Sequence, residues 1–154
     1  MIDTGSFRYS HARSAVLTTA AMLIFPWICA AQSTPLPEPE VTLAVAITID
    51  AENLIELYQS VPGLKIIDSR HYEDHILGHI ETALSLPLNQ TDCKALSKLA
   101  KSTEQAMVFY SNNNAGDASI EAIQIASDCG YERLFWFRGG FVEWKDKDYP
   151  YVIE

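Results

Sequence analysis

Short apolar runs alternate along the chain with segments whose apolar residues recur at helical spacing. Short apolar runs bounded by polar residues, glycine or proline are typical of buried strands, and recurrence every three or four residues is typical of helices. The predicted strands are Val41–Ile49, Leu64–Asp68, Ala83–Pro87, Ala106–Tyr110 and Leu134–Phe137. The predicted helices are Asn53–Tyr58 after an Asp50 cap, His71–Leu77, a helix from Asp92 to about Lys101, Ala118–Cys129, and a short helix after Gly139 and Gly140.

This order of elements predicts the fold class. Strands that alternate with helices pair in parallel through right-handed crossovers, which places the helices over the sheet. We therefore predict a single α/β domain with a central, mostly parallel sheet flanked by helices on both faces. Pro150 is expected to close the fold, and the sequence shows no internal repeat and no second domain.

The first 31 residues differ in character from the rest of the chain. Two arginines precede an apolar run over residues 15–31, which ends in small residues. This pattern is typical of a secretory signal peptide and predicts cleavage after Ala31, and hence a periplasmic or secreted protein. An uncleaved membrane anchor is the alternative, because the run approaches the length that spans a bilayer; Pro26 and the small-residue end favour removal.

Residues 32–40, QSTPLPEPE, predict an extended linker, because they are rich in proline and polar residues. The folded domain is then expected over residues 41–154. Without residues 1–31 the chain has nine lysines and arginines against nineteen aspartates and glutamates, a net charge of −10. Nucleic acid and anionic membrane surfaces repel such a chain, so we expect neither as a partner.

The segment AMVFYSNNNAGDAS, residues 106–119, is the strongest candidate for a binding site. In a parallel sheet, ligands bind where loops leave the carboxyl ends of strands, and a helix that begins there offers free N–H groups to an anion. The loop contains no cysteine, lysine, arginine or histidine, so it predicts a binding loop without a reactive group. Its residues are Ser111, Asn112, Asn113, Asn114, Ala115, Gly116, Asp117, Ala118 and Ser119.

Three histidines, His71, His75 and His79, are the candidate bases and metal ligands of the domain. Their spacing of four would align them on one face of a continuous helix as a metal site, but Gly78 is expected to interrupt that helix. We therefore predict no metal and no cofactor. A serine hydrolase built on Ser111 would need a positioned base and an orienting carboxylate, and we do not expect one.

Two cysteines, Cys93 and Cys129, follow the predicted signal peptide. In an oxidising compartment such a pair can form a disulfide. The alternative is a buried thiol at a helix end, because the sequence does not show whether the two Cα atoms approach closely enough. Both alternatives stay open.

Three motifs, in order, resemble the rhodanese (sulfurtransferase-like) family from about Ile47 to Pro150. Residues 66–70, IIDSR, are similar to that family's strand ending in Asp-x-Arg. Residues 78–87, GHIETALSLP, are similar to its Gly-His-Ile-x-x-Ala segment, except that Thr82 stands where the family usually has glycine. Residues 138–144, RGGFVEW, are similar to its Gly-Gly-x-x-x-Trp signature.

The resemblance implies a site at the loop. In active members a cysteine follows the strand equivalent to Ala106–Tyr110, takes a sulfane sulfur from thiosulfate or a similar donor, and passes it to an acceptor. Ser111 holds that position here, and a serine hydroxyl cannot form a stable persulfide. Asp117 adds negative charge to a loop that has no cation, which disfavours a bound anion.

We therefore predict an exported rhodanese-like protein that does not transfer sulfur and that binds a small polar ligand or a protein segment at the loop. One alternative is an active thiosulfate-type sulfurtransferase that uses Cys93, Cys129 or a partner's cysteine. Another is an interaction module of a periplasmic redox or respiratory system. The oligomeric state is not predicted. The framework residues near the loop are expected to be Asp68, Arg70 and His79, in structural roles.

Overall fold

The structure is a computed structural model that describes residues 43–113 and 117–154, without the side chain of Asp117. The predicted signal peptide, the predicted linker over residues 32–40 and the loop residues Asn114, Ala115 and Gly116 lie outside the described residues. Within the described ranges, no helix is long and apolar enough to span a membrane.

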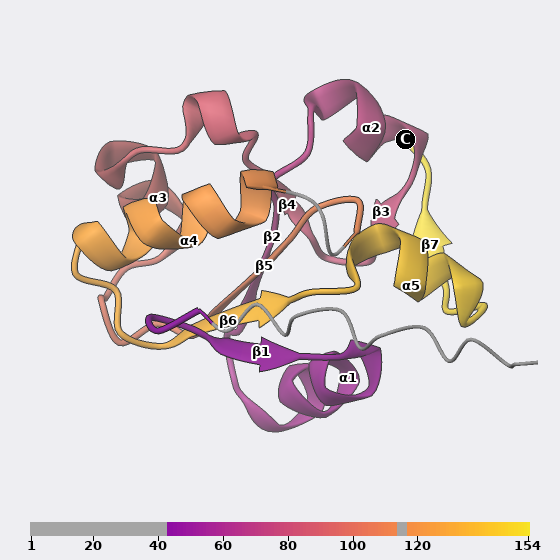
Figure 1. The fold of residues 1–154 in the computed structure, drawn as a ribbon, viewed down its shortest axis with the longest axis horizontal. Coiled ribbons are helices and arrows are strands. Elements are labelled where there is room, and N and C mark those ends of the chain that lie inside the picture. The colour runs from indigo at the N-terminus through magenta and orange to yellow at the C-terminus, as the bar shows by residue number, and fades with distance from the viewer. Residues whose placement is uncertain (1–42, 114–116) are drawn as a thin grey trace, which may run out of the picture. The chain divides into compact units, whose positions relative to one another are not determined.

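Five strands form one sheet in the order β1-β6-β5-β2-β4, and each neighbouring pair is parallel (Figure 1). The predicted parallel α/β sheet is therefore confirmed. β5 lies at the centre and all four of its side chains are buried. The strands are β1 (Ile47–Ile49), β2 (Lys65–Asp68), β4 (Leu84–Ser85), β5 (Met107–Tyr110) and β6 (Leu134–Phe137).

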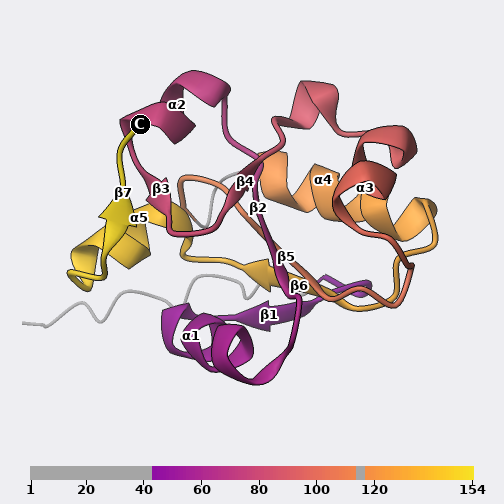
Figure 2. The ribbon, with the colours of Figure 1, turned by 180° about the vertical axis from the view of Figure 1, so that it is seen from behind.

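Helices cover both faces of the sheet, as predicted (Figure 1, Figure 2). Successive side chains of a strand point to opposite faces. Met107 and Phe109 of β5 accordingly pack in the core beneath α3 and α4, while Val108 and Tyr110 pack beneath α1 and α5. The helices are α1 (Ala51–Ser60), α2 (Tyr72–Leu77), α3 (Cys93–Leu99), α4 (Asp117–Asp128) and α5 (Gly140–Asp146), with a short 3-10 helix, η1 (Leu88–Gln90).

Two aspartates cap helices by accepting a hydrogen bond from an otherwise unpaired backbone N–H group. Asp50 Oδ1 accepts from Asn53 N at 2.8 Å at the start of α1, which confirms the predicted cap. Asp92 Oδ1 accepts from Ala95 N at 2.6 Å at the start of α3. Both helices therefore begin where the sequence pattern predicts.

Two of the predicted boundaries are wrong. Among the described residues of the strand predicted over Val41–Ile49, only β1 is a strand, because residues 43–46 form a turn in which Ala46 N donates to Leu43 O. Pro150 does not close the fold, because β7 (Tyr151–Val152) follows it and pairs antiparallel with β3 (His79–Ile80). Both strands have two residues, too few for a recognisable alternation.

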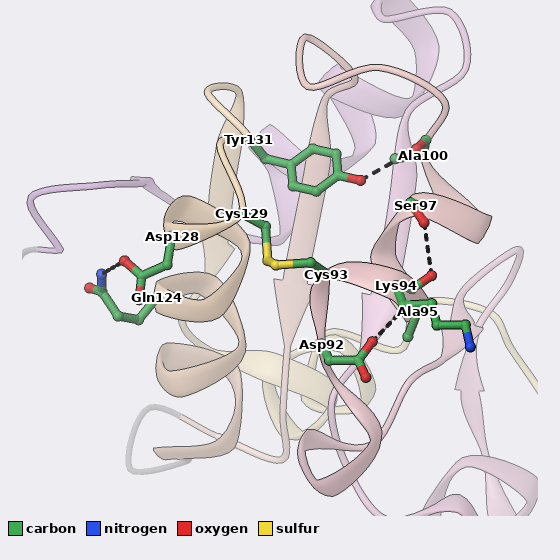
Figure 3. Close-up of a disulfide and its surroundings, with 10 residues drawn as sticks. All are labelled: Asp92, Cys93, Lys94, Ala95, Ser97, Ala100, Gln124, Asp128, Cys129 and Tyr131. Carbon is green, nitrogen blue, oxygen red and sulfur yellow. Dashed lines mark hydrogen bonds between the residues drawn. A yellow bond between two sulfur atoms is a disulfide. The ribbon is translucent and has the colours of Figure 1, made fainter.

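A disulfide joins Cys93, the first residue of α3, to Cys129, which follows the last residue of α4 (Figure 3). The two Cα atoms are 5.4 Å apart, within the normal range for such a bond. The sequence left a disulfide and buried thiols as alternatives, and the structure has the disulfide. The bond ties together the two helices that cover one face of the sheet.

Replacing Cys93 and Cys129 together with serine is expected to lower the free energy of unfolding. The cysteines are 36 positions apart, and cross-linking a loop of that size stabilises the native state by about 4 kcal/mol by restricting the unfolded chain. Urea unfolding of the oxidised protein and the double variant measures the difference. Reductant should destabilise the wild type and leave the double variant unchanged; equal stability of the two proteins would contradict the expectation.

Candidate functional site

The candidate site lies at the carboxyl ends of the central strands. In the pairing register, the last residues of β2, β5 and β6 are neighbours: Asp68 pairs with Tyr110, and Tyr110 with Phe137. Ser69 and Ser111 follow β2 and β5 directly, and Ser69 N donates to Tyr110 O at 3.0 Å. The two serines therefore leave the sheet at the edge where parallel α/β sheets bind ligands.

Ser111, the residue at the predicted nucleophile position, is 3% exposed. Its hydroxyl lies 3.2 Å from the hydroxyl of Ser119, which also accepts a hydrogen bond from Trp136 Nε1 at 3.1 Å. Because Ser119 belongs to the first turn of α4, the side chain of Ser111 lies beside the start of that helix. The positive end of the helix dipole lies there, and it favours negative charge.

Two of the three candidate histidine bases have structural hydrogen bonds. His75 Nδ1 lies 2.9 Å from Asp68 Oδ2, and His79 Nδ1 lies 2.9 Å from the carbonyl oxygen of His75. Both rings are buried. His71 is exposed and is the N-cap residue of α2. His79 is thus the first residue of β3, next to a turn, and it does not line the pocket that contains Ser111.

A pocket of about 380 Å³ opens beside Ser111. It contains loop residues Ser111, Asn112 and Ala118 of the predicted site, together with Arg70 of the predicted framework. The pocket also contains residues that were not predicted to line the site: Ser69, His71, Asp74, Leu88 and Asn89. The pocket thus combines hydroxyl, amide and ionisable groups with the apolar side chains of Leu88 and Ala118.

The loop also borders a second hollow, of about 580 Å³, which does not include Ser111. Asn113 and Arg138 line it together with the acidic residues Asp50, Glu143 and Asp146. This second hollow is larger, but three carboxylates line it together with its two cations, Arg138 and Lys147. The pocket beside Ser111 is the better candidate, because it contains Ser111 and lies at the ends of β2 and β5.

Ser69 is an unusual pocket residue. It is 2% exposed, and its Oγ has no hydrogen-bond partner within the described part of the chain. A buried hydroxyl without a partner destabilises the fold by about 1–3 kcal/mol. Its hydroxyl can therefore form a hydrogen bond with a polar molecule that reaches it from the pocket.

Asp68 and Arg70 form a buried ion pair beneath the pocket. Arg70 Nε donates to Asp68 Oδ1 at 2.8 Å, and Arg70 Nη2 donates to Asp68 Oδ2 and to the carbonyl oxygen of Gly78. The guanidinium also lies 4.3 Å from the ring centre of Phe141. The positive charge of Arg70 is therefore neutralised by a carboxylate, which leaves little of it to attract an anion into the pocket.

The environment of Asp68 changes its ionisation. Burial alone would raise the pKa of this carboxyl, but the hydrogen bonds and charge of Arg70, with hydrogen bonds from His75 and Tyr110, hold the pKa below its ordinary value. Burial and the neighbouring Asp68 charge in turn raise the pKa of Tyr110. Asp68 is therefore ionised and Tyr110 is protonated at neutral pH. Both residues support the site structurally and do not face the pocket.

Gly140 fixes the position of the loop. Phe141 N donates to Ser111 O at 2.9 Å, and Val142 N donates to Asn112 O at 2.9 Å, so the start of α5 lies directly against the loop backbone. Gly140 has a φ of +60°, and a Cβ atom there would lie 2.3 Å from Ser111 O. Only glycine fits this contact. Gly140 is therefore part of the site although it does not line the pocket beside Ser111.

Gly140→Ala is expected to destabilise the protein by about 3 kcal/mol, because the left-handed backbone disfavours alanine by about 1–2 kcal/mol and the clash adds a similar amount. Gly130→Ala is the matched control: its φ is +88°, but its nearest neighbour would be 3.8 Å from the new Cβ. Chemical denaturation should show a distinctly larger loss for Gly140→Ala. Equal losses for the two variants would mean that the contact with Ser111 is unimportant.

The cysteines of the described residues lie away from this pocket. Ser111 is beside the first turn of α4 and Cys129 follows its last residue, so a 12-residue helix separates them, a length of about 18 Å. Cys93 is bonded to Cys129. Neither residue offers a thiolate, and neither is near the loop.

The fold and the site define a class of protein: a parallel α/β domain whose loop after the central strand borders a polar pocket at the start of a helix. A model of the rhodanese-like domain family matches residues 50–147. The chain belongs to the rhodanese-like domain family. A search of the curated proteins found no match.

Solved structures have the same fold. The BH2092 protein from Bacillus halodurans matches with a TM-score of 0.62 and 23% identity, covering 70% of this chain and 77% of that one. The rhodanese-like domain of the Alr3790 protein from Anabaena sp. matches with a TM-score of 0.61 and 22% identity, covering 70% and 79%. Thiosulfate sulfurtransferase from Pseudomonas aeruginosa matches with a TM-score of 0.62 and 16% identity, covering 70% of this chain but 20% of that one.

Proposed function

We propose that this chain is an exported rhodanese-like protein that does not transfer sulfur and that uses the pocket beside Ser111 to bind a small polar molecule or a protein segment. One observation carries the proposal. The position that begins the loop after β5 holds a serine, and both cysteines of the described residues are joined in a disulfide.

The chemistry of the loop supports the lack of sulfur transfer. A persulfide requires a thiolate, and the hydroxyl of Ser111 is poorly acidic and cannot carry a sulfane sulfur. The hydroxyl of Ser111 also lies within hydrogen-bond distance of the Ser119 hydroxyl, which in turn accepts a hydrogen bond from Trp136 Nε1. These contacts favour a structural or ligand-contacting role for Ser111.

The pocket supports a binding role. Ser69 supplies a buried hydroxyl that needs a partner, and Asn89 and Asn112 add amides that can donate and accept. Arg70 is neutralised by Asp68, and the carboxylate of Asp74 also lines the pocket. A neutral polar group, such as a peptide amide, suits these residues better than an anion does.

The disulfide supports export. Disulfides persist in secreted and periplasmic proteins and are rare in the cytosol. The signal-peptide pattern of residues 1–31 independently points to the same compartment. The proposed location is therefore the periplasm or the exterior.

A thiosulfate and cyanide assay tests the lack of sulfur transfer. The wild type and Ser111→Ala are both expected to release no thiocyanate above the rate without protein, because neither has a thiolate in the loop. Release that Ser111→Ala retains and that the Cys93/Cys129 double serine variant loses would support the alternative, an active sulfurtransferase that uses another cysteine. Release lost in Ser111→Ala would give the serine a catalytic role and contradict the proposal.

A further inference from the structure

Outside the pocket, α2, β3 and the end of the chain after β7 come together (Figure 1, Figure 2). Three side chains of types that bind metals lie there: His75, His79 and Glu154. One ligand atom from each lies within 4.8 Å of the other two. His75 Nε2 and Glu154 Oε1 are 4.0 Å apart.

The hydrogen bonds of both histidines leave Nε2 in the form that binds metals. His79 Nδ1 faces the carbonyl oxygen of His75, which can only accept, so Nδ1 of His79 carries the proton. His75 Nδ1 faces the ionised carboxylate of Asp68 and donates in the same way. In the neutral rings both Nε2 atoms therefore have a free lone pair, and across the described ranges no hydrogen bond engages either atom.

This second layer of contacts is characteristic of metal sites. Histidine ligands usually donate their other ring nitrogen to a carboxylate or a backbone carbonyl, which fixes the ring and raises its basicity. Asp68 accepts this hydrogen bond from His75, and the carbonyl oxygen of His75 accepts it from His79. Both rings are buried, and each is held through its Nδ1 atom.

Backbone contacts hold Glu154, the third residue of the cluster, near the two histidines. Glu154 N donates to Ile76 O at 3.1 Å. β7, which ends two residues before Glu154, pairs with β3, so His79 lies opposite Val152. The carboxylate itself is about half exposed, with 51% of the side chain accessible. It can therefore move toward the two nitrogens without disturbing the core.

We propose that His75, His79 and Glu154 bind a divalent transition-metal cation, for which Zn²⁺ is the natural probe. Two imidazoles and one carboxylate are a normal ligand set for Zn²⁺, with a fourth position left for water. The His75 and His79 rings are stacked, with centres 3.8 Å apart and an angle of 11° between planes. Because the lone pair of each Nε2 lies in its ring plane, binding opens the stack so that the two Nε2 atoms face one ion about 3.4 Å apart, and it draws in the carboxylate.

This inference does not depend on the proposed binding role of the pocket. The cluster joins the last segment of the chain to α2 and β3, whereas the pocket is bordered by the loop after β5. A bound ion would therefore stabilise the β3-β7 pair and leave the pocket open.

Calorimetric titration of ZnCl₂ into the tag-free, EDTA-treated protein tests the site. We expect one Zn²⁺ per chain, and an affinity at least tenfold lower in Glu154→Gln, because this variant keeps the shape and loses the charged ligand. Glu132→Gln, an exposed residue near β6, is the matched control and should bind as the wild type does. Absent binding, or equal affinity in the wild type and Glu154→Gln, would overturn the proposal.

Ring-nitrogen NMR spectra locate the ion without a core substitution. Before addition, the neutral forms of the His75 and His79 rings should carry their proton on Nδ1 and not on Nε2. Zn²⁺ should shift the Nε2 signals of these two residues and leave those of His71 unchanged. Shifts confined to His71, or the opposite ring-proton positions in His75 and His79, would refute the site.

Discussion

Asp68→Asn is expected to lower the free energy of unfolding at pH 7 by about 3–5 kcal/mol, which is the usual effect of removing one charge from a buried ion pair. Asp68 is fully buried and accepts hydrogen bonds from the Arg70 side chain and from Tyr110 at 2.8 Å. The asparagine would leave the buried guanidinium of Arg70 without its counter-charge. Urea unfolding followed by circular dichroism measures the loss.

The same carboxylate predicts how stability depends on pH. Its pKa in the folded protein lies below the ordinary value of 3.8, so the unfolded chain takes up a proton first as the pH falls. The stabilisation by Asp68 is therefore complete above about pH 4 and is lost as the pH drops through the folded pKa. The difference between the wild type and Asp68→Asn should shrink at pH 3.

Glu52→Gln is the matched control for this prediction. Hydrogen bonds from Lys147 also lower the pKa of Glu52, but the pair is exposed to solvent. Exposed ion pairs contribute little to stability, so this variant should unfold nearly as the wild type does. A loss for Asp68→Asn no larger than the loss for Glu52→Gln would contradict the role assigned to the buried pair.

Ser111→Cys is expected to convert the loop from inert to reactive toward thiosulfate. The new thiol would lie beside the first turn of α4 and near the hydroxyl of Ser119, and a helix start lowers the pKa of a thiol. The resulting thiolate can accept a sulfane sulfur. We expect thiocyanate release at least tenfold above that of the wild type, measured at neutral pH with thiosulfate and cyanide.

Ser60→Cys provides the control for a new cysteine in general. Ser60 is the exposed last residue of α1 and lies outside the pocket. This variant should remain inactive. If Ser111→Cys is folded but no more active than Ser60→Cys, then the missing nucleophile is not the only defect, and the acidic Asp117 and the neutralised Arg70 also prevent sulfur transfer.

The sequence pattern predicted the parts of the fold that depend on local regularity. β2, β5 and β6 are apolar runs because helices cover both of their faces. Asp50 and Asp92 mark helix starts because their side chains accept hydrogen bonds from backbone N–H groups that have no partner within the helix. β3 and β7 depend instead on pairing between residues more than 70 positions apart. Such pairing leaves no periodic signal, so the chain was wrongly predicted to end its fold at Pro150.

The site could be predicted only in part for a similar reason. The loop and Ser111 stand out because a polar segment follows a buried strand. Ser69 is hidden within the Asp-Ser-Arg motif, and only the register of β2 against β5 places it next to Ser111. Gly140 was noted as part of a motif, but its contact with the Ser111 carbonyl required three-dimensional geometry.

For the histidines, the sequence argued against a cluster that the structure contains. Their spacing of four suggested a shared face, and the break expected at Gly78 argued against a metal site. Gly78 does end α2, yet β3 returns His79 so that its ring stacks on His75. The third member, Glu154, reaches the pair through β7, the strand that the sequence pattern missed.

Intact-mass spectrometry after treatment with thiosulfate tests the central claim most directly. The claim is that the rhodanese-like framework is present and the sulfur-accepting group is absent. The oxidised wild-type protein should keep its mass unchanged, and Ser111→Cys should gain the mass of one sulfur atom, located by peptide mapping at residue 111. A sulfur adduct on the wild-type chain, at Cys93, Cys129 or any residue of the loop, would contradict the account.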